Sequence, residues 1–205
     1  MKNLISQFLI IISFLVLCGC AATYKNVNPP SINYSSHDLQ DGISLSYRYD
    51  ILREKGNTKY AKKEDNKGVK LIAIKLTNNT DSVINVNKDL VFYSGSNAVI
   101  PMDPLAIKNT IKQVVPGYLP YLLLSFVNLY VTKDNKTETY HIGLVLGPGI
   151  TIGNMAVAST SNTNMLNELN EYNILYSDIK KGETLFGIIG LRDVGYNPIS
   201  VKLKK

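Results

Sequence analysis

The chain has 205 residues, and its 22 Lys and Arg against 16 Asp and Glu give a net charge of +6. That surplus is too small to require nucleic acid as a partner, and the length suits one domain with a hydrophobic core rather than two. Both cysteines, Cys18 and Cys20, lie at the end of an N-terminal apolar run. The remainder of the chain therefore has no disulfide framework, cysteine nucleophile or cysteine-ligated metal.

Residues 1–19 have the composition of an export signal. Lys2 provides the positive start, and residues 8–17 form an apolar run of about ten residues, too short to cross a bilayer as a helix. The run ends in Leu17-Cys18-Gly19-Cys20. This ending resembles the lipobox of bacterial lipoprotein precursors, in which an apolar residue and two small residues precede a cysteine.

The resemblance implies cleavage between Gly19 and Cys20, diacylglycerol on the Cys20 sulfur and acylation of the new N-terminus. Two or more acyl chains make a stable membrane anchor. By the same resemblance, Ala21 after the lipidated residue favours the outer membrane, facing the periplasm or the surface, if the source has two membranes. An ordinary secretory signal and an uncleaved anchor remain the alternatives.

The segment at 20–41 is polar, contains Pro29-Pro30 and is rich in Ser and Asn. It predicts a lipidated, flexible tether in front of a domain at 42–205. Residues 43–51 alternate apolar and polar side chains, which is typical of a half-buried strand. Residues 54–68 are predicted to be a charged, solvated hairpin loop, because Lys, Glu, Asp and Gly dominate them.

Further strands follow on both sides of a long insertion. Residues 69–76 have apolar side chains on both faces, so this strand is expected to be buried on both sides. The other predicted strands are 83–86, 90–93, 99–100, 183–191 and 199–203. The runs KLTNNTDSVINV, LVFYSGSNAVIP and KKGETLFGIIGL resemble the strands and turns of immunoglobulin-like sandwiches in uncharacterised envelope lipoproteins. The predicted fold is therefore mainly β, an immunoglobulin-like β-sandwich with a hydrophobic, helical insertion at about 104–177.

The insertion begins with a predicted helix at 104–113, with Asp103 as its N-cap and Pro104 at its first position. Two apolar runs follow, at 118–131 and 140–158, separated by a charged turn at 132–139. Apolar residues at helical spacing then predict a helix at about 152–172.

Two interpretations of the apolar runs are open. In one, 114–158 is a membrane-embedded hairpin, in which Gly143 and Gly147, and Gly149 and Gly153, have the spacing of closely packed membrane helices. In the other, the hairpin is buried against an open face of the sandwich. The sequence favours burial, because Pro120 and Pro148 interrupt runs that barely reach the length of a spanning helix. The candidate residues for membrane or partner contact are Tyr118, Tyr121, Leu122, Leu123, Phe126 and Tyr130.

No residue pattern indicates catalysis, a metal or a cofactor. The two histidines, His37 and His141, form no HExxH motif, and residues 147–153 match no phosphate-binding loop. The acid pairs Glu64-Asp65 and Glu168/Glu171 are expected to be solvated. We therefore predict no catalytic residue, no metal ligand and no cofactor.

The sequence thus predicts a lipid-anchored envelope lipoprotein that is not an enzyme and acts as a binding or scaffolding module. Its predicted partners are the membrane, through the N-terminal lipid, and envelope proteins, without nucleic acid. The alternative is a lipoprotein that embeds the hairpin at 114–158 in a membrane or perturbs it. An enzyme with a carboxylate-based site is the third, least favoured hypothesis.

Overall fold

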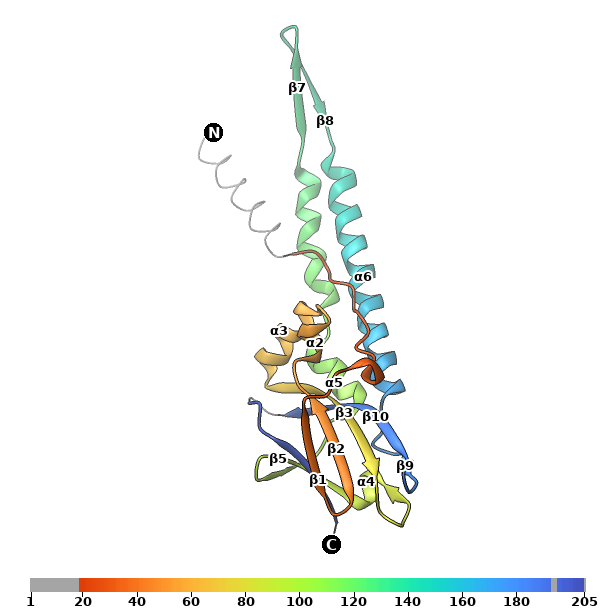
Figure 1. The fold of residues 1–205 in the computed structure, drawn as a ribbon. Helices are drawn as coiled ribbons and strands as arrows, with labels where there is room; N and C mark the ends of the chain where they lie inside the picture. Colours follow the sequence, from red (N-terminus) through yellow and green to blue (C-terminus); the bar gives the residue numbers. More distant parts are fainter. Residues whose placement is uncertain (1–18, 193–194, 205) are drawn as a thin grey trace. The chain divides into compact units, whose positions relative to one another are not determined.

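The computed structural model describes residues 19–192 and 195–204, and the chain divides into two compact units (Figure 1). Unit 1 contains residues 19–23 and 113–161, and unit 2 contains residues 24–112 and 162–204. Residues 1–18 of the predicted signal at 1–19 lie outside the described residues. The last residue of the signal, Gly19, and the predicted lipidation site, Cys20, are described.

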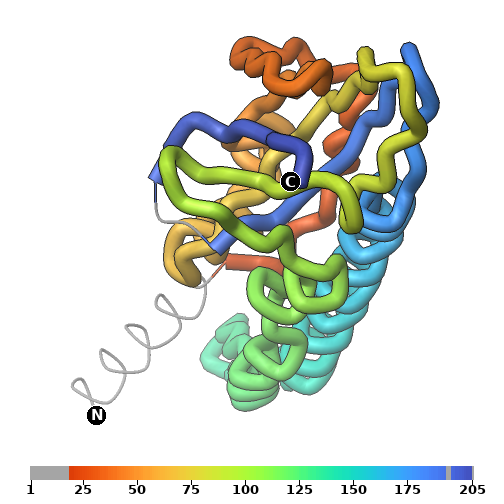
Figure 2. The backbone as a smooth tube through the Cα atoms, turned by 90° about the horizontal axis from the view of Figure 1, so that it is seen from below, coloured from red at the N-terminus to blue at the C-terminus, as the bar shows by residue number. Residues whose placement is uncertain are grey.

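Unit 2 is built on antiparallel sheets. The larger sheet has the order β1 (Ser36–Gln40), β2 (Ile43–Arg48), β3 (Val69–Asn78) and β10 (Thr184–Arg192). The second sheet has the order β11 (Ile199–Leu203), β5 (Leu90–Ser94) and β6 (Asn97–Val99), and Figure 2 shows β11 beside β5 near the C-terminus. The strands β4 (Ile84–Asn85) and β9 (Asp178–Ile179) form a separate pair.

The helices of unit 2 are short, apart from the end of α6. They are η1 (Pro29–Ser31), α2 (Ile51–Glu54), α3 (Thr58–Lys67), α4 (Val86–Asp89), α5 (Pro104–Ile111) and the last part of α6 (Gly143–Glu171). The start of α5 confirms its prediction, because the Asp103 carboxylate accepts a hydrogen bond of 2.8 Å from the Leu105 N–H and Pro104 occupies the first turn.

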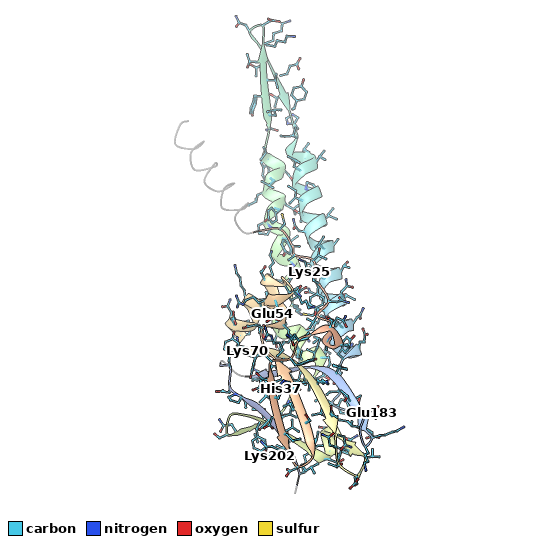
Figure 3. The ribbon with its side chains drawn as sticks, in the orientation of Figure 1. Lys25, His37, Glu54, Lys70, Glu183 and Lys202 are labelled. Carbon is cyan, nitrogen blue, oxygen red and sulfur yellow. The ribbon has the colours of Figure 1, made fainter. Side chains whose placement is uncertain are left out.

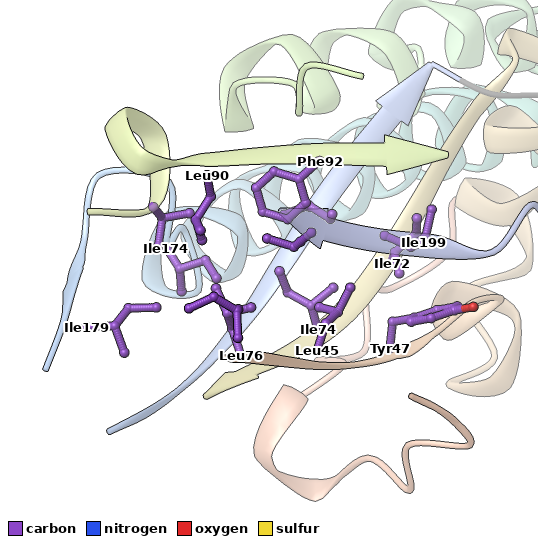
Figure 4. Close-up of a cluster of buried hydrophobic side chains, with 14 of the residues drawn as sticks. Leu45, Tyr47, Ile72, Ile74, Leu76, Leu90, Phe92, Ile174, Ile179 and Ile199 are labelled. Atoms are coloured by element: carbon purple, nitrogen blue, oxygen red, sulfur yellow. The ribbon is translucent and has the colours of Figure 1, made fainter. Parts of the chain in front are cut away.

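Strand β3 lies at the centre of unit 2 and is buried on both faces, as its sequence predicted. Ile72, Ile74 and Leu76 point into one cluster, which includes Leu90 and Phe92 of the second sheet (Figure 4). The alternate residues of β3 point into a second cluster, formed with α2, α3, α5 and α6. That cluster includes Leu71, Ala73, Tyr60, Ile107, Met165 and Leu169.

The structure is mixed α/β rather than mainly β. The predicted strands at 43–51, 69–76, 90–93, 183–191 and 199–203 correspond to β2, β3, β5, β10 and β11. Antiparallel sheets and a long helix in the insertion agree with the prediction, whereas the finer assignment to an immunoglobulin-like sandwich stays a prediction.

The predicted hairpin loop at 54–68 is wrong, because these residues complete α2 and form α3. Tyr60 and Ala61 lie on the buried face of α3, with Glu64 one turn further along, and Gly68 ends the helix in the left-handed conformation. The helix was not predicted because Glu64 occupies a position on its buried face, where the sequence pattern of a helix usually has an apolar residue.

The predicted tether at 20–41 is packed in the structure rather than extended into solvent. Within unit 2, Tyr24 and Val27 are buried in the helix-side cluster. Glu168 of α6 holds this segment, because its carboxylate accepts hydrogen bonds from the Tyr24 hydroxyl (2.6 Å) and the Asn28 N–H (2.8 Å). The segment ends in β1, which pairs with β2 along its whole length.

Unit 1 is a hairpin of two helical arms and two strands. Its first arm is the 3₁₀ helix η2 (Val115–Phe126), followed by β7 (Leu129–Lys133). The second strand, β8 (Lys136–Tyr140), leads into the second arm, which is the first part of α6. Asp134 and Asn135 join the strands with φ of 49° and 59°, the positive values that a two-residue type I′ turn requires.

Candidate membrane-contact site

The part of α6 in unit 1 has an inverted distribution of side chains. Small and polar residues face η2 and are buried, whereas large apolar residues face outward, with Val145 76% and Ile152 67% exposed. The buried residues are Gly143, Gly147, Thr151, Asn154, Ala158 and Ser161. The exposed large apolar residues are Leu144, Val145, Leu146, Ile152 and Val157. A helix with this pattern buries its small side chains and leaves its apolar area uncovered.

The glycines of the buried face allow the backbones of the two arms to approach closely. A Cβ on Gly147 would lie 2.6 Å from the Ser125 amide nitrogen and would overlap the Ser125 hydroxyl. A Cβ on Gly143 would lie 2.6 Å from the carbonyl oxygens of Ser125 and Val127. Gly149 and Gly153 lie on the outward side, where an added Cβ meets nothing within 4 Å. The packing therefore requires glycine at 143 and 147 only.

The first arm has the same inverted distribution. Phe126 is 71% exposed, and Leu119, Leu122 and Leu123 are each close to half exposed. Tyr118 and Tyr121 are buried instead, with their rings stacked 6.4 Å apart. Leu122, Leu123 and Phe126, three of the candidate contact residues, are thus exposed on unit 1.

The predicted contact residues thus separate into two groups. Tyr118 and Tyr121 lie inside unit 1 and contribute little to its surface. The exposed ones are Leu122, Leu123, Phe126 and Tyr130. The side chains that the sequence did not single out are Leu144, Val145, Leu146 and Ile152 of α6.

Three polar side chains inside unit 1 are paired within the unit. The Thr151 hydroxyl donates to the Gly147 carbonyl (2.7 Å), and the Asn154 amide donates to the Ile150 carbonyl (2.8 Å). The Tyr118 hydroxyl donates to the Gln113 side chain (3.1 Å). Such internal pairing is what a segment surrounded by hydrocarbon needs, since lipid offers no hydrogen-bond partner.

The junction between the helical arms and the strands is paired in the same way. The Gly143 N–H donates to the Val127 carbonyl (2.9 Å), which closes the hairpin across the two arms. Beside it, His141 Nδ1 and the Asn128 side-chain oxygen lie 2.8 Å apart, which is hydrogen-bonding distance.

The arms of unit 1 have no charged side chain. Residues 113–132 and 139–161 contain no Asp, Glu, Lys or Arg. The charged residues between them, Lys133, Asp134, Lys136 and Glu138, all belong to the tip of the β7–β8 hairpin. The residues labelled in Figure 3, Lys25, His37, Glu54, Lys70, Glu183 and Lys202, belong to unit 2. The surface of the arms is thus apolar and uncharged over two long stretches.

The part of α6 in unit 2 has the ordinary distribution of a soluble helix. There Met165 and Leu169 are buried, and the exposed residues are Thr163, Asn164, Asn167, Asn170 and Glu171. The exposed face changes from apolar to polar between Val157 and Ser159. One continuous helix therefore has a lipid-like surface pattern at one end and a water-like pattern at the other.

Among the residues that the structure describes, α6 is the one helix long and apolar enough to cross a bilayer. Only 22% of its most apolar 18-residue window is buried. Packing among the described residues therefore leaves most of this window uncovered.

Cys20 is exposed and lies in unit 1. The two residues that follow it are attached to the arms: the Ala21 N–H donates to the Asn154 side chain (2.5 Å), and the Ala22 backbone exchanges two hydrogen bonds with Gln113 (3.0 and 2.6 Å). The predicted lipidation site is thus fixed beside the second arm, close to where the surface of α6 changes character.

The acid pairs noted in the sequence, Glu64-Asp65 and Glu168/Glu171, lie in unit 2, where Glu64, Asp65 and Glu168 make hydrogen bonds with neighbouring residues. Glu64 is buried, accepts a hydrogen bond of 2.6 Å from the Leu71 N–H, and has its pKa raised to about 7 because burial disfavours its charge. Its neighbour Asp65 lies at the surface between Arg53 and Lys70, each 2.7 Å away, and the hydrogen bond from Lys70 lowers its pKa. The pKa of the Tyr24 hydroxyl is raised mainly by burial and, to a smaller extent, by the neighbouring Glu168 carboxylate.

The expectation that both acid pairs are solvated is thus wrong for Glu64 and Glu168, and right for Asp65 and Glu171. His37 is placed on β1, where its ring nitrogen lies 2.7 Å from the Ser46 hydroxyl. No group of three or more His, Cys, Asp or Glu side chains able to hold a metal occurs in the described part of the chain.

Comparisons with protein-family models, with curated proteins and with solved structures found no match to this chain.

Proposed function

We propose that the protein is a lipid-anchored membrane protein whose unit 1 is embedded in a lipid bilayer and so holds unit 2 at the membrane. The observation that carries the proposal is the inverted burial of α6, in which Gly143, Gly147 and Asn154 are inside and Val145 and Ile152 are outside. Membrane helices pack through small residues, since lipid solvates large apolar side chains as well as a protein core does.

A bilayer explains the exposed apolar surface better than water does. Soluble monomers rarely display contiguous apolar patches larger than a few hundred Å². Unit 1 exposes large apolar side chains on both arms and no charge between 139 and 161. A protein partner of matching apolar shape is the competing occupant. Lipid is favoured because Cys20, the predicted acylation site, lies on the same unit.

The role as a binding or scaffolding module at an envelope remains a prediction, and the membrane-embedded hairpin is its structural core. Unit 2 supports such a role as a stable body with two apolar clusters. The outer-membrane location predicted from Ala21 stays a proposal of the same kind.

The test removes the lipid and asks whether the hairpin alone holds the protein in a membrane. The mature chain carrying Cys20→Ala is reconstituted into phosphatidylcholine vesicles and floated on a density gradient, then washed with carbonate at high pH. We expect the protein to float and to resist the wash. Recovery in the soluble fraction without detergent contradicts the proposal, and flotation that the wash reverses shows surface attachment instead.

A further inference from the structure

The lengths of the two arms show how far unit 1 reaches across a bilayer, an inference that rests on the proposed function. The 12 residues of η2 rise about 24 Å, at about 2.0 Å per residue. On the other arm, Gly143 to Val157 rises about 22 Å, at about 1.5 Å per residue. The two helical arms therefore have the same length and fill most of a hydrocarbon core about 30 Å thick.

The β7–β8 hairpin continues beyond the helices. Each strand has five residues and adds about 17 Å, at about 3.3 Å per residue. Arms and hairpin together thus exceed the thickness of the hydrocarbon core by about 10 Å. If the core begins near Val157, where the exposed face of α6 becomes apolar, the far end of the hairpin lies outside it.

Hydrogen bonding gives the same placement for the hairpin. Two strands alone leave the outward-facing N–H and C=O groups on both edges unpaired, and all ten strand residues are exposed. Open strand edges are avoided deep in hydrocarbon, because lipid offers no hydrogen-bond partner for the unpaired groups. The edges of β7 and β8 therefore need water or headgroups, whereas the helical arms have no such need.

The side chains change along the hairpin in the matching order. Tyr130 and Tyr140 are exposed where the helices meet the strands, and tyrosine side chains favour the membrane–water interface. Beyond them come Lys133, Asp134, Lys136 and Glu138. From the arms to the tip, the side chains change from apolar to aromatic to charged. This is the order expected from the centre of a bilayer through one leaflet to water.

We propose that the hairpin crosses the whole bilayer and presents its tip, residues 133–138, in the headgroups and water of the far leaflet, on the side opposite to the polar end of α6. The protein is then a two-pass membrane protein with an exposed strand pair on the far side. An insertion confined to one leaflet would leave the charged residues of the tip in hydrocarbon.

The test counts labels on single molecules, so that it does not depend on the orientation of the protein in the vesicle. In the mature chain carrying Cys20→Ala, Thr137→Cys places one thiol at the tip and Asn164→Cys places another on the exposed polar face of α6. The reduced double variant is reconstituted, floated with the vesicles, and treated from outside with a membrane-impermeant maleimide. Mass spectrometry then counts the labels on each molecule.

Crossing predicts one label on every molecule and two after detergent is added, because the two thiols face opposite sides. Molecules with two labels or with none, in intact vesicles, overturn the inference, since both thiols then lie on one side. The single variants Thr137→Cys and Asn164→Cys, with maleimide trapped inside the vesicles, check that each thiol is reactive. Failure to float overturns the proposed function instead, so the two failures are distinguishable.

Discussion

A lysine in the middle of the proposed membrane segment tests the contact surface of α6. Val145 is the most exposed large apolar residue of that helix, and twelve residues, or about 18 Å, separate it from Val157. That depth is near the middle of a hydrocarbon core about 30 Å thick, beyond the reach of a lysine side chain to either surface. Val145→Lys therefore exposes a charge to lipid.

The expected magnitude follows from the cost of a lysine at the centre of a membrane helix. That cost is about 3 kcal/mol, which corresponds to a partition coefficient lower by about 150-fold. The fraction of Cys20→Ala protein that floats with neutral phosphatidylcholine vesicles, measured over a range of lipid concentrations, gives the partition coefficient. Neutral lipid is required because anionic headgroups attract lysine irrespective of depth.

Two matched variants make the result specific. Asn164→Lys places the same charge on the exposed polar face of α6, and we expect it to change partitioning by less than about twofold. Val145→Leu keeps the apolar character and is expected to partition as the parent does. The reasoning is refuted if Val145→Lys floats as efficiently as Asn164→Lys.

Three further predictions, each with a matched comparison, test the packing inside each unit. Gly147→Ala places a Cβ against Ser125 and should destabilise unit 1 by about 1–3 kcal/mol, whereas Gly153→Ala, whose Cβ meets open space, should raise stability by up to about 1 kcal/mol. Thermal unfolding in detergent micelles measures both, and shifts in the same direction contradict the packing. Glu168→Ala removes the acceptor for the Tyr24 hydroxyl and the Asn28 N–H, at a cost of about 1–3 kcal/mol, and should speed trypsin cleavage after Lys25, whereas Glu171→Ala should not. Equal cleavage of the two variants rules out the anchoring role of Glu168. Glu64 binds its proton more tightly in the folded state, so its contribution to stability is complete below pH 4.5 and is lost as pH rises to about 7, by on the order of 3 kcal/mol. Urea unfolding followed by tyrosine fluorescence should show that fall in the parent and not in Glu64→Gln, and an identical pH profile for the two disproves the assignment.

The sequence predicted the elements whose local pattern agrees with their environment. Strands β2, β3, β10 and β11 have period-two or doubly apolar patterns, and α5 has an N-cap with proline in its first turn. The helix α3 was missed because its buried face includes Glu64, whose cost of burial is reduced by the Leu71 N–H. A prediction made from each segment separately does not include a hydrogen bond between a helix and the strand that follows it.

The surface of unit 1 was left open between two interpretations for a different reason. The rule that large apolar residues lie inside holds in water, and applied to Leu122, Leu123 and Phe126 it favours burial. The spacing of Gly143 and Gly147 already indicated close helix packing, and it proved to mark the inner face of the hairpin. The sequence also shows that residues 113–132 and 139–161 contain no charged side chain. This absence of charge indicates a membrane segment only when combined with the structure, in which both stretches contain a helical arm.

The most direct test of the central claim measures what surrounds Val145. A nitroxide spin label on Val145→Cys, in the mature Cys20→Ala chain reconstituted in vesicles, reports its collisions with oxygen, which concentrates in lipid, and with a nickel complex, which stays in water. Embedding in the bilayer predicts frequent collisions with oxygen and few with nickel, with the opposite result for a label on Asn164→Cys. Frequent nickel collisions at 145, or few collisions with either reagent because protein covers the site, would contradict the account.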